Sequence, residues 1–142
     1  MFKKILVPTD ASEYSQRALT TALEMARTFG AEVVLLHVSY TPQAYWGYTI
    51  SYGLTISQED LYKNGEAALE ASVSGLDLSG LTVTQKLEAG HPVTVILDQI
   101  EEEKVDLVVM GSHGYGPIVG SVLGSVSQRV LQRAEVPVMI VK

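Results

Sequence analysis

The chain has 142 residues and the composition of a globular protein, and we assign it to one domain over residues 1–142. Sixteen Asp and Glu against ten Lys and Arg give a net charge of -6, which argues against a nucleic-acid partner because such binding depends on neutralising phosphates. The chain has no cysteine and no apolar run near the roughly 18 residues of a membrane span, so we expect a cytoplasmic protein without disulfides or a membrane partner.

Nine elements alternate along the chain, each recognised by its hydrophobic pattern. In order, they are a strand at residues 5–7, a helix that ends before Gly30, a strand at 33–38, a helix that begins near Ser57, a strand at 81–87, a helix that begins at Pro92, a strand at 107–110, a helix at about 125–134 and a strand at 136–141. The strand at 81–87 alternates apolar and polar residues, which indicates a half-exposed edge strand.

The predicted helices carry apolar residues three and four positions apart. We expect Gly30 to follow the first helix in the left-handed conformation that glycine adopts readily, and Pro92 to occupy the first turn of the third. In the last helix we expect Val126, Val130 and Leu131 to be buried.

This alternation of strands and helices predicts an α/β fold with a five-stranded parallel, doubly wound sheet. Winding outward from the first strand in both directions gives the strand order 3-2-1-4-5. Ligands of such sheets bind outside the carboxyl ends of the strands between which the winding reverses. The candidate site therefore lies in the loops that follow Val7 and Met110.

The loop after the fourth strand has the composition of an anion-binding segment. Five of the twelve glycines lie between Gly111 and Gly124, and Gly124-Ser125 begins the next helix. Glycines let backbone N–H groups approach a phosphate, and a helix N-terminus carries partial positive charge. The Walker and G-x-G-x-x-G motifs do not fit, because Pro117 and Val119 stand where they require Lys and Gly. A glycine-rich surface turn without a ligand is the alternative interpretation.

The spacing Gly111-x2-Gly114-x9-Gly124-Ser125 resembles the nucleotide-binding motif of the universal stress protein family, G-x2-G-x9-G-[ST]. Three further segments are similar to the family's first, second and last strands: residues 3–12, 35–38 and 136–141. The resemblance thus covers the whole chain. It implies a Rossmann-like fold of the adenine nucleotide alpha hydrolase type and an ATP-binding protein of stress response and signalling.

The resemblance also implies which residues bind the nucleotide. They are Pro8, Thr9, Asp10, Val38, Met110, Gly111, Gly114, Gly124, Ser125 and Val126. The three motif glycines and Ser125 match the positions that hold the phosphates, and Asp10 matches the acidic position near the ribose and the metal-associated phosphates. Val38 matches the residue whose backbone meets adenine, and Met110 matches the apolar residue beside it.

One departure from the family concerns the charge of the site. Members often carry Lys or Arg after the second glycine, where this chain has Tyr115, and no Lys or Arg lies between residues 105 and 128. Phosphate charge would then rest on backbone dipoles, hydroxyls and a divalent ion such as Mg²⁺. The choice among ATP, ADP, AMP and cyclic AMP stays open. We expect at most a very slow ATPase, because phosphoryl transfer needs cationic stabilisation.

Asp10 has two interpretations at this stage. In a strand-to-helix turn an Asp is first of all a helix cap, and Asp10 and Glu13 have the spacing of a capping box. At the switch point Asp10 is also placed to accept from a ribose hydroxyl or a metal-bound water. We name no catalytic residue and no direct metal ligand, and we expect the adjacent Ser112 and His113 not to face each other as a dyad.

The uncharged segment 39–58 is rich in aromatic residues: Tyr40, Tyr45, Trp46, Tyr48 and Tyr52. It leaves the second strand near the expected adenine pocket. It packs on the domain, covers the nucleotide, or forms a surface for a subunit or an unidentified protein partner, and these alternatives stay open. The last case would make the chain an interaction module without catalysis.

The closing strand, from Val136 to Val141, is apolar and contains Pro137, which suits an edge of the sheet. A bare apolar edge favours pairing with another chain. The family resemblance implies antiparallel pairing of this strand in a homodimer.

Overall fold

The computed structural model describes residues 1–40, 58–114 and 123–142. In chain order its elements are β1 (Lys4–Pro8), α1 (Glu13–Phe29), β2 (Glu32–Tyr40), α3 (Gln58–Val73), β3 (Val83–Gly90), α4 (Pro92–Glu102), β4 (Leu107–Gly111), α5 (Ser125–Arg133) and β5 (Val138–Val141). The strands form one parallel sheet in the order β3-β2-β1-β4-β5. The predicted α/β fold and strand order are confirmed.

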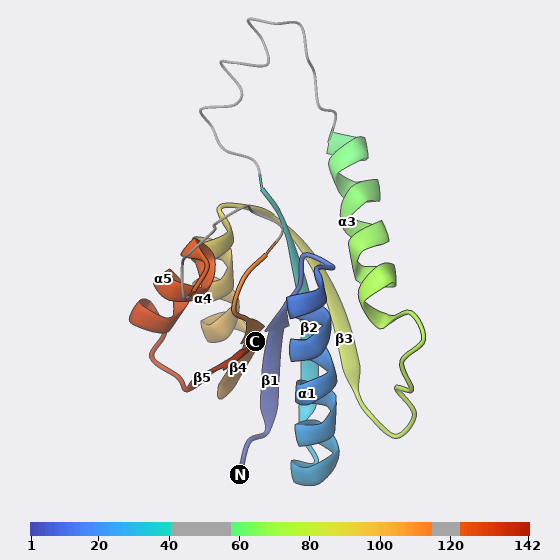
Figure 1. The fold of residues 1–142 in the computed structure, drawn as a ribbon, viewed down its shortest axis with the longest axis vertical. Helices are drawn as coiled ribbons and strands as arrows, with labels where there is room; N and C mark the ends of the chain where they lie inside the picture. The colour runs from blue at the N-terminus through green and yellow to red at the C-terminus, as the bar shows by residue number, and fades with distance from the viewer. Residues whose placement is uncertain (41–57, 115–122) are drawn as a thin grey trace, which may run out of the picture.

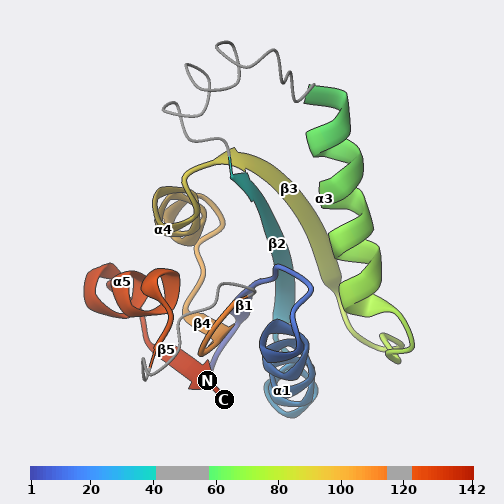
Figure 2. The ribbon, with the colours of Figure 1, turned by 45° about the horizontal axis from the view of Figure 1, so that its top comes forward.

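The sheet divides the apolar core into two layers, because successive side chains of a strand point to opposite faces. Ile5 and Val7 of β1 belong to the layer under α1 and α3, and Leu6 belongs to the layer under α4 and α5. All three side chains are fully buried. Figures 1 and 2 show α1 and α3 on one face of the sheet and α4 and α5 on the other. Helices on both faces explain why β1 is apolar at every central position.

The predicted helix ends at Gly30 and Pro92 are confirmed. Gly30 follows α1 with a φ of 68°, and its N–H donates to the Ala26 carbonyl. Pro92 is the first residue of α4. Proline fits there because an N–H at this position has no hydrogen-bond partner within the helix. Among the residues that the structure describes, no helix has both the length and the apolar character needed to cross a bilayer.

Two strands begin later than their patterns predict. The N–H of Leu81 donates to the Leu78 carbonyl and closes a turn, so β3 begins at Val83. Pro137 precedes β5, and its carbonyl accepts from the Val108 N–H at 3.0 Å, but proline has no N–H with which to extend the ladder. The predicted edge position of β3 is confirmed, because β3 ends the sheet beside β2.

One of the three residues predicted to be buried in α5 faces solvent. Val130 is fully buried and Val126 is half-buried, but Leu131 is 44% exposed. α5 packs on the sheet through one side, and a residue that follows Val130 is turned by roughly 100° about the helix axis. Leu131 therefore leaves the packed side.

Some predictions concern residues that the structure does not describe. They are Tyr45, Trp46, Tyr48, Tyr52, Ser57, Tyr115, Pro117 and Val119.

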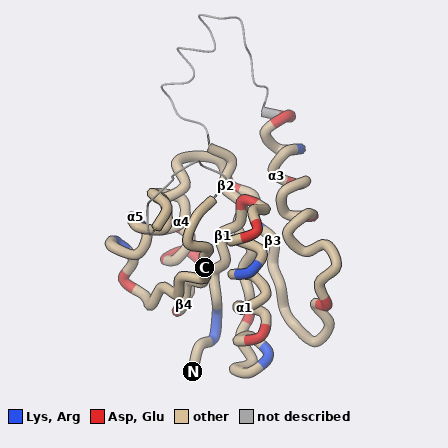
Figure 3. The backbone as a smooth tube through the Cα atoms, viewed as in Figure 1, with Lys and Arg blue, Asp and Glu red and all other residues tan. Residues whose placement is uncertain are grey.

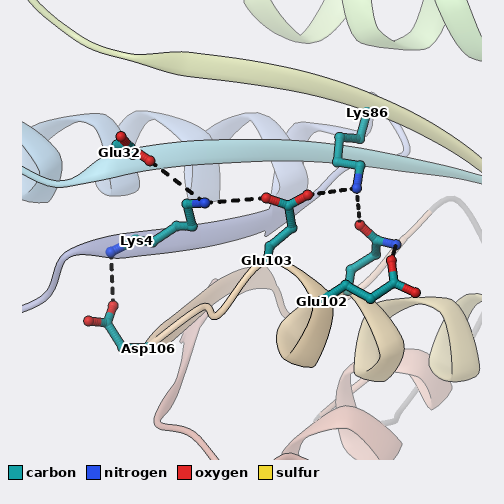
Figure 4. A network of polar contacts seen from close by, with 7 residues as sticks. Lys4, Glu32, Lys86, Glu102, Glu103 and Asp106 are labelled. Atoms are coloured by element: carbon teal, nitrogen blue, oxygen red, sulfur yellow. Dashed lines mark hydrogen bonds and ion pairs between the residues drawn. The ribbon is translucent and has the colours of Figure 1, made fainter.

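An ion-pair network joins the amino end of the sheet to the end of α4 (Figure 4). Its centre is the Glu103 carboxylate, which lies 3.3 Å from Lys4 Nζ and 2.8 Å from Lys86 Nζ. Lys86 Nζ also donates to Gln99 Oε1 at 2.6 Å. Lys4 belongs to the basic stretch at the start of β1 (Figure 3). The same view shows acidic residues along α1 and α3, away from this network. The hydrogen bonds from Lys86 and Lys4 hold the pKa of Glu103 below its ordinary value.

We therefore predict that Glu103→Gln changes the pH dependence of folding. A lowered pKa in the folded state means that ionised Glu103 stabilises the fold above its unfolded pKa, and that this contribution is lost as the pH falls through the folded pKa. The substitution should lower the free energy of unfolding at pH 7 by about 1 kcal/mol. At a pH below the folded pKa of Glu103 it should have little effect, because the wild-type carboxyl is then protonated.

Urea unfolding across this pH range measures the effect. Glu101→Gln is the matched control, because Glu101 is an exposed residue in the last turn of α4, two positions before Glu103. Equal loss of stability for Glu103→Gln at neutral and acid pH would show that the ionised carboxylate does not stabilise the fold.

Candidate functional site

A pocket of about 360 Å³ lies outside the carboxyl ends of β1 and β4. Its described lining comes from the loop after β1, the end of β2, the loop after β4 and the first turns of α1, α4 and α5. Small-molecule sites typically have volumes of roughly 300–1,000 Å³. The pocket occupies the switch point that the strand order predicts.

All ten residues that the family resemblance implies line this pocket: Pro8, Thr9, Asp10, Val38, Met110, Gly111, Gly114, Gly124, Ser125 and Val126. They come from four separate parts of the chain. The parallel sheet brings them together because the carboxyl ends of its strands lie at one edge.

Asp10 holds the turn between β1 and α1 and does not cap the helix. Its Oδ1 accepts from the Ser12 N–H at 2.9 Å. Ser12 is the N-cap, and its side chain accepts from the Ser15 N–H. Ala11, between them, has a φ of 65°, a conformation that a residue with a Cβ rarely adopts. The capping-box interpretation is therefore wrong, and Asp10 lies in the pocket lining as a half-buried carboxylate.

The Thr9 side chain points into the protein. Its hydroxyl lies 2.6 Å from Ser72 Oγ of α3 and 3.2 Å from Ser15 Oγ of α1, and it accepts from the Ala11 N–H at 3.1 Å. The Thr9 carbonyl lies 2.8 Å from His37 Nδ1. Thr9 is buried and its hydroxyl is engaged by other hydroxyls, so its contribution to the pocket is to position the turn.

Two motif glycines allow backbones to approach closely at the junction of β4 and α5. A Cβ on Gly111 would lie 2.7 Å from Tyr14 Cβ and 2.8 Å from the Tyr14 carbonyl carbon. A Cβ on Gly124 would lie 3.3 Å from both His113 Cα and the Ser112 oxygen. The protein's own packing thus favours glycine at 111 and 124, whatever ligand is bound.

The N-terminus of α5 is fixed against the end of β4. The Gly124 N–H donates to the Ser112 carbonyl at 2.7 Å, and the Ser127 hydroxyl donates to the Gly111 carbonyl at 2.8 Å. Gly124 is the N-cap residue and contributes no side chain. The first N–H groups of a helix have no partner within it and carry partial positive charge. Gly124, Ser125 and Val126 place this end of α5 in the pocket lining.

Ser112 and His113 meet, contrary to the expectation from their adjacency. Ser112 Oγ lies 3.0 Å from His113 Nδ1. The imidazole ring also packs against Tyr14, with ring centroids 5.3 Å apart, and Arg17 lies over the Tyr14 ring at 4.9 Å. The expectation failed because Nδ1 is the ring nitrogen nearer the His113 backbone, so the hydroxyl of the preceding Ser112 can reach it. These contacts hold the His113 ring at the side of the pocket.

The pocket combines an apolar part with a polar part. Leu36, Val38, Ile96 and Met110 form the apolar part, whereas Asp10, Ser125 and the start of α5 are polar. The described lining contains no Lys or Arg. Nor do the described residues bring three His, Asp or Glu side chains together as a metal site. This donor set fits a divalent ion held mainly by a ligand's phosphates and water, with Asp10 as a supporting carboxylate.

Comparison with known proteins assigns the family. The sequence model of the universal stress protein family matches residues 1–142. The chain belongs to the universal stress protein family. The resemblance inferred from the glycine motif is therefore confirmed.

Individual relatives agree with this assignment. Universal stress protein MJ0531 of Methanocaldococcus jannaschii is 32% identical over 100% of this chain and 83% of its own length. The structure of MJ0577 from the same organism is 32% identical, with a TM-score of 0.83 over 100% of this chain and 96% of that chain. A universal stress protein from Archaeoglobus fulgidus, solved in complex with dAMP, is 25% identical, with a TM-score of 0.71 over 99% of this chain and 98% of its own.

Seven residues of this universal stress protein line the pocket beyond the ten that the resemblance implies. They are Ser15, Leu36, Tyr40, Pro92, Ile96, His113 and Ser127. Two patterns in the sequence could have identified several of them. Leu36, Val38 and Tyr40 alternate along one strand and so share a face of the sheet. Pro92 and Ile96 follow a strand, and the N-terminus of such a helix lies at the same edge as the other ligand loops.

Proposed function

We propose that this universal stress protein binds an adenine nucleotide, ATP first among the candidates, and acts as a stress-response and signalling module. One observation carries the proposal: the N-terminus of α5 and an apolar surface formed by Val38, Ile96 and Met110 open into the same pocket. A ligand with an anionic end and a flat apolar end matches both. The Archaeoglobus fulgidus relative solved with dAMP supports this ligand class.

The proposed contacts follow the two parts of the pocket. Gly111, Gly114, Gly124 and Ser125 receive the phosphates, with Val126 in the first turn of the same helix. Asp10 accepts from the ribose or from a water of a phosphate-bound Mg²⁺. Three further residues, Pro8, Thr9 and Met110, complete the lining around the sugar and base, and Val38 offers its backbone to adenine. The pocket geometry and the family motif support these contacts.

We propose binding without rapid turnover. Phosphoryl transfer requires cationic groups that stabilise the transferring phosphoryl, and the described lining has no Lys or Arg. Asp10 is the carboxylate of that lining, and its Oδ1 is engaged by the Ser12 N–H. The nucleotide is thus proposed as a bound ligand and not as a rapidly consumed substrate. AMP and cyclic AMP remain alternative ligands for the same site.

A substitution at the N-cap of α5 tests the phosphate position. We predict that Gly124→Asp weakens ATP binding at least about tenfold relative to Gly124→Asn, because a carboxylate there opposes the phosphates. The two side chains have nearly the same shape, so they share any steric cost of the 3.3 Å contacts at this position. Both are also favourable N-cap residues, which preserves α5.

Isothermal titration calorimetry with ATP measures the difference, and thermal unfolding verifies that both variants fold. The gap between the variants should shrink as salt concentration rises, because the repulsion is electrostatic. Equal affinities for ATP would place the phosphates elsewhere.

A substitution at Asp10 tests the role of Mg²⁺. Asp10→Asn retains the Oδ1 acceptor for the Ser12 N–H but removes the negative charge. Without Mg²⁺ the variant should bind ATP more tightly than the wild type, because the Asp10 carboxylate no longer repels the phosphates. With Mg²⁺ the variant should bind ATP less tightly than the wild type, because the ion loses the Asp10 carboxylate as a partner. Titrations with Mg²⁺ and with EDTA give the two comparisons. If Asp10→Asn changed both affinities in the same direction, Asp10 would have no role toward the ion.

We further propose that β5 pairs with β5 of a second copy to form a homodimer. β5 is the terminal strand of the sheet, and Met139 is 37% exposed. The Pro137 carbonyl accepts from the Val108 N–H of β4, and the Val141 carbonyl accepts from the N–H of Ser112, the residue after β4. Since alternate residues of a strand bond to the same neighbour, Val138 and Ile140 direct their N–H and C=O groups to the free edge.

Sedimentation equilibrium tests the dimer. We expect the wild type to be a dimer at micromolar concentration. Val138→Pro should shift it toward monomer by removing an outward N–H, whereas Val138→Ala should leave it dimeric. A monomeric wild type would refute the proposed pairing.

A further inference from the structure

Tyr40 lies at the end of an apolar row on β2. Leu36, Val38 and Tyr40 are two residues apart, so their side chains share the face of the sheet that carries α4 and α5. All three line the pocket. Leu36 is fully buried, Val38 is half-buried and Tyr40 is 51% exposed. The row thus runs from the core to the mouth of the pocket and ends in an aromatic ring.

His91 lies against this ring because of the register between β2 and β3. Tyr40 is paired with Gly90, the last residue of β3, and His91 follows directly. The two ring centroids are 5.8 Å apart, and the ring planes are inclined at 74°. Such an edge contact occupies at most one face of the tyrosine ring and restricts its rotation. His91 is the N-cap residue of α4, but its side chain makes no capping hydrogen bond.

The surroundings of Tyr40 suit a flat apolar group. Pro92 and Ile96 of α4 line the same pocket as Val38, and the partly exposed Tyr40 ring adds an aromatic surface at its mouth. The polar groups of the pocket come from the loops after β1 and β4 and from α5. An aromatic ring at an apolar end is the usual arrangement for stacking on a nucleobase.

We propose that Tyr40 stacks on the base of the bound nucleotide and that His91 is a positioning residue that holds the Tyr40 ring. This inference rests on the proposed function, since it names the residue that contacts the base of the proposed ligand. It predicts that Tyr40 contributes affinity for the base and none for the sugar and phosphate. Purines should gain more from it than pyrimidines, because their stacking area is larger.

The test compares dAMP with deoxyribose 5-phosphate, which has the same sugar and phosphate but no base. Stacking on an aromatic side chain is worth about 1–3 kcal/mol per base, or roughly 5- to 150-fold in affinity. Tyr40→Ala should lose that factor toward dAMP in calorimetric titrations and bind deoxyribose 5-phosphate, followed by NMR titration, as the wild type does. Tyr40→Phe should keep dAMP affinity. Tyr62→Ala is the control, because Tyr62 is another exposed tyrosine, 57% accessible, on α3.

Substitutions at His91 test its positioning role. His91→Ala should lower dAMP affinity by a smaller factor than Tyr40→Ala and leave deoxyribose 5-phosphate binding unchanged. His91→Phe retains an edge contact with Tyr40 and should restore dAMP affinity. A purely structural role in α4 would instead lower the melting temperature without changing the ratio of the two affinities.

The outcomes separate this inference from the proposed function. If the wild type bound neither dAMP nor ATP, the proposed function would fail, and this inference with it. If the wild type bound dAMP and Tyr40→Ala bound it equally well, only the stacking role would be overturned. An equal loss toward dAMP and deoxyribose 5-phosphate would also overturn it, because the effect would then not involve the base.

Discussion

β1 and β4 lie side by side and parallel, yet the helices that follow them cover opposite faces of the sheet. The chain leaving β1 must turn toward α1, and the chain leaving β4 must turn toward α5, so the two loops diverge. The pocket lies at this point, outside the carboxyl ends of β1 and β4, where the winding of the sheet reverses. The site therefore follows from the topology, and the side chains determine which ligand it suits.

The glycine motif serves the protein's own packing as well as the proposed ligand. Gly111 lies against the Tyr14 backbone, and Gly124 lies against the Ser112 carbonyl, so side chains there would separate α1 and α5 from the end of β4. Those contacts place the N-terminus of α5 beside the loop after β1. An anion in the pocket would use N–H groups that the fold already aligns, which lowers the entropic cost of binding.

The two layers of the core also meet at this site. The Thr9 hydroxyl contacts Ser72 of α3 and Ser15 of α1, while Leu36, Ile96 and Met110 belong to the opposite layer and line the pocket. The residues around the pocket are therefore held in place by contacts within the protein, before any ligand binds. The ion-pair network around Glu103 lies at the other end of α4, so a test of stability there does not alter the pocket.

Hydrophobic periodicity determined, from the sequence alone, the strand order and the position of the site, because these depend on patterns within short segments. The resemblance to the universal stress protein family added ten residues that line the pocket. Only the tertiary structure decided that Ser12 caps α1 in place of Asp10, since that choice depends on the positive φ of Ala11. The same holds for the Tyr40–His91 contact, which requires the register between two strands, and for Ser72 beneath Thr9, 63 positions away. The periodicity of a segment indicates which face of a helix or strand a residue occupies. Contacts between side chains that are distant in sequence depend on the packing of the whole chain.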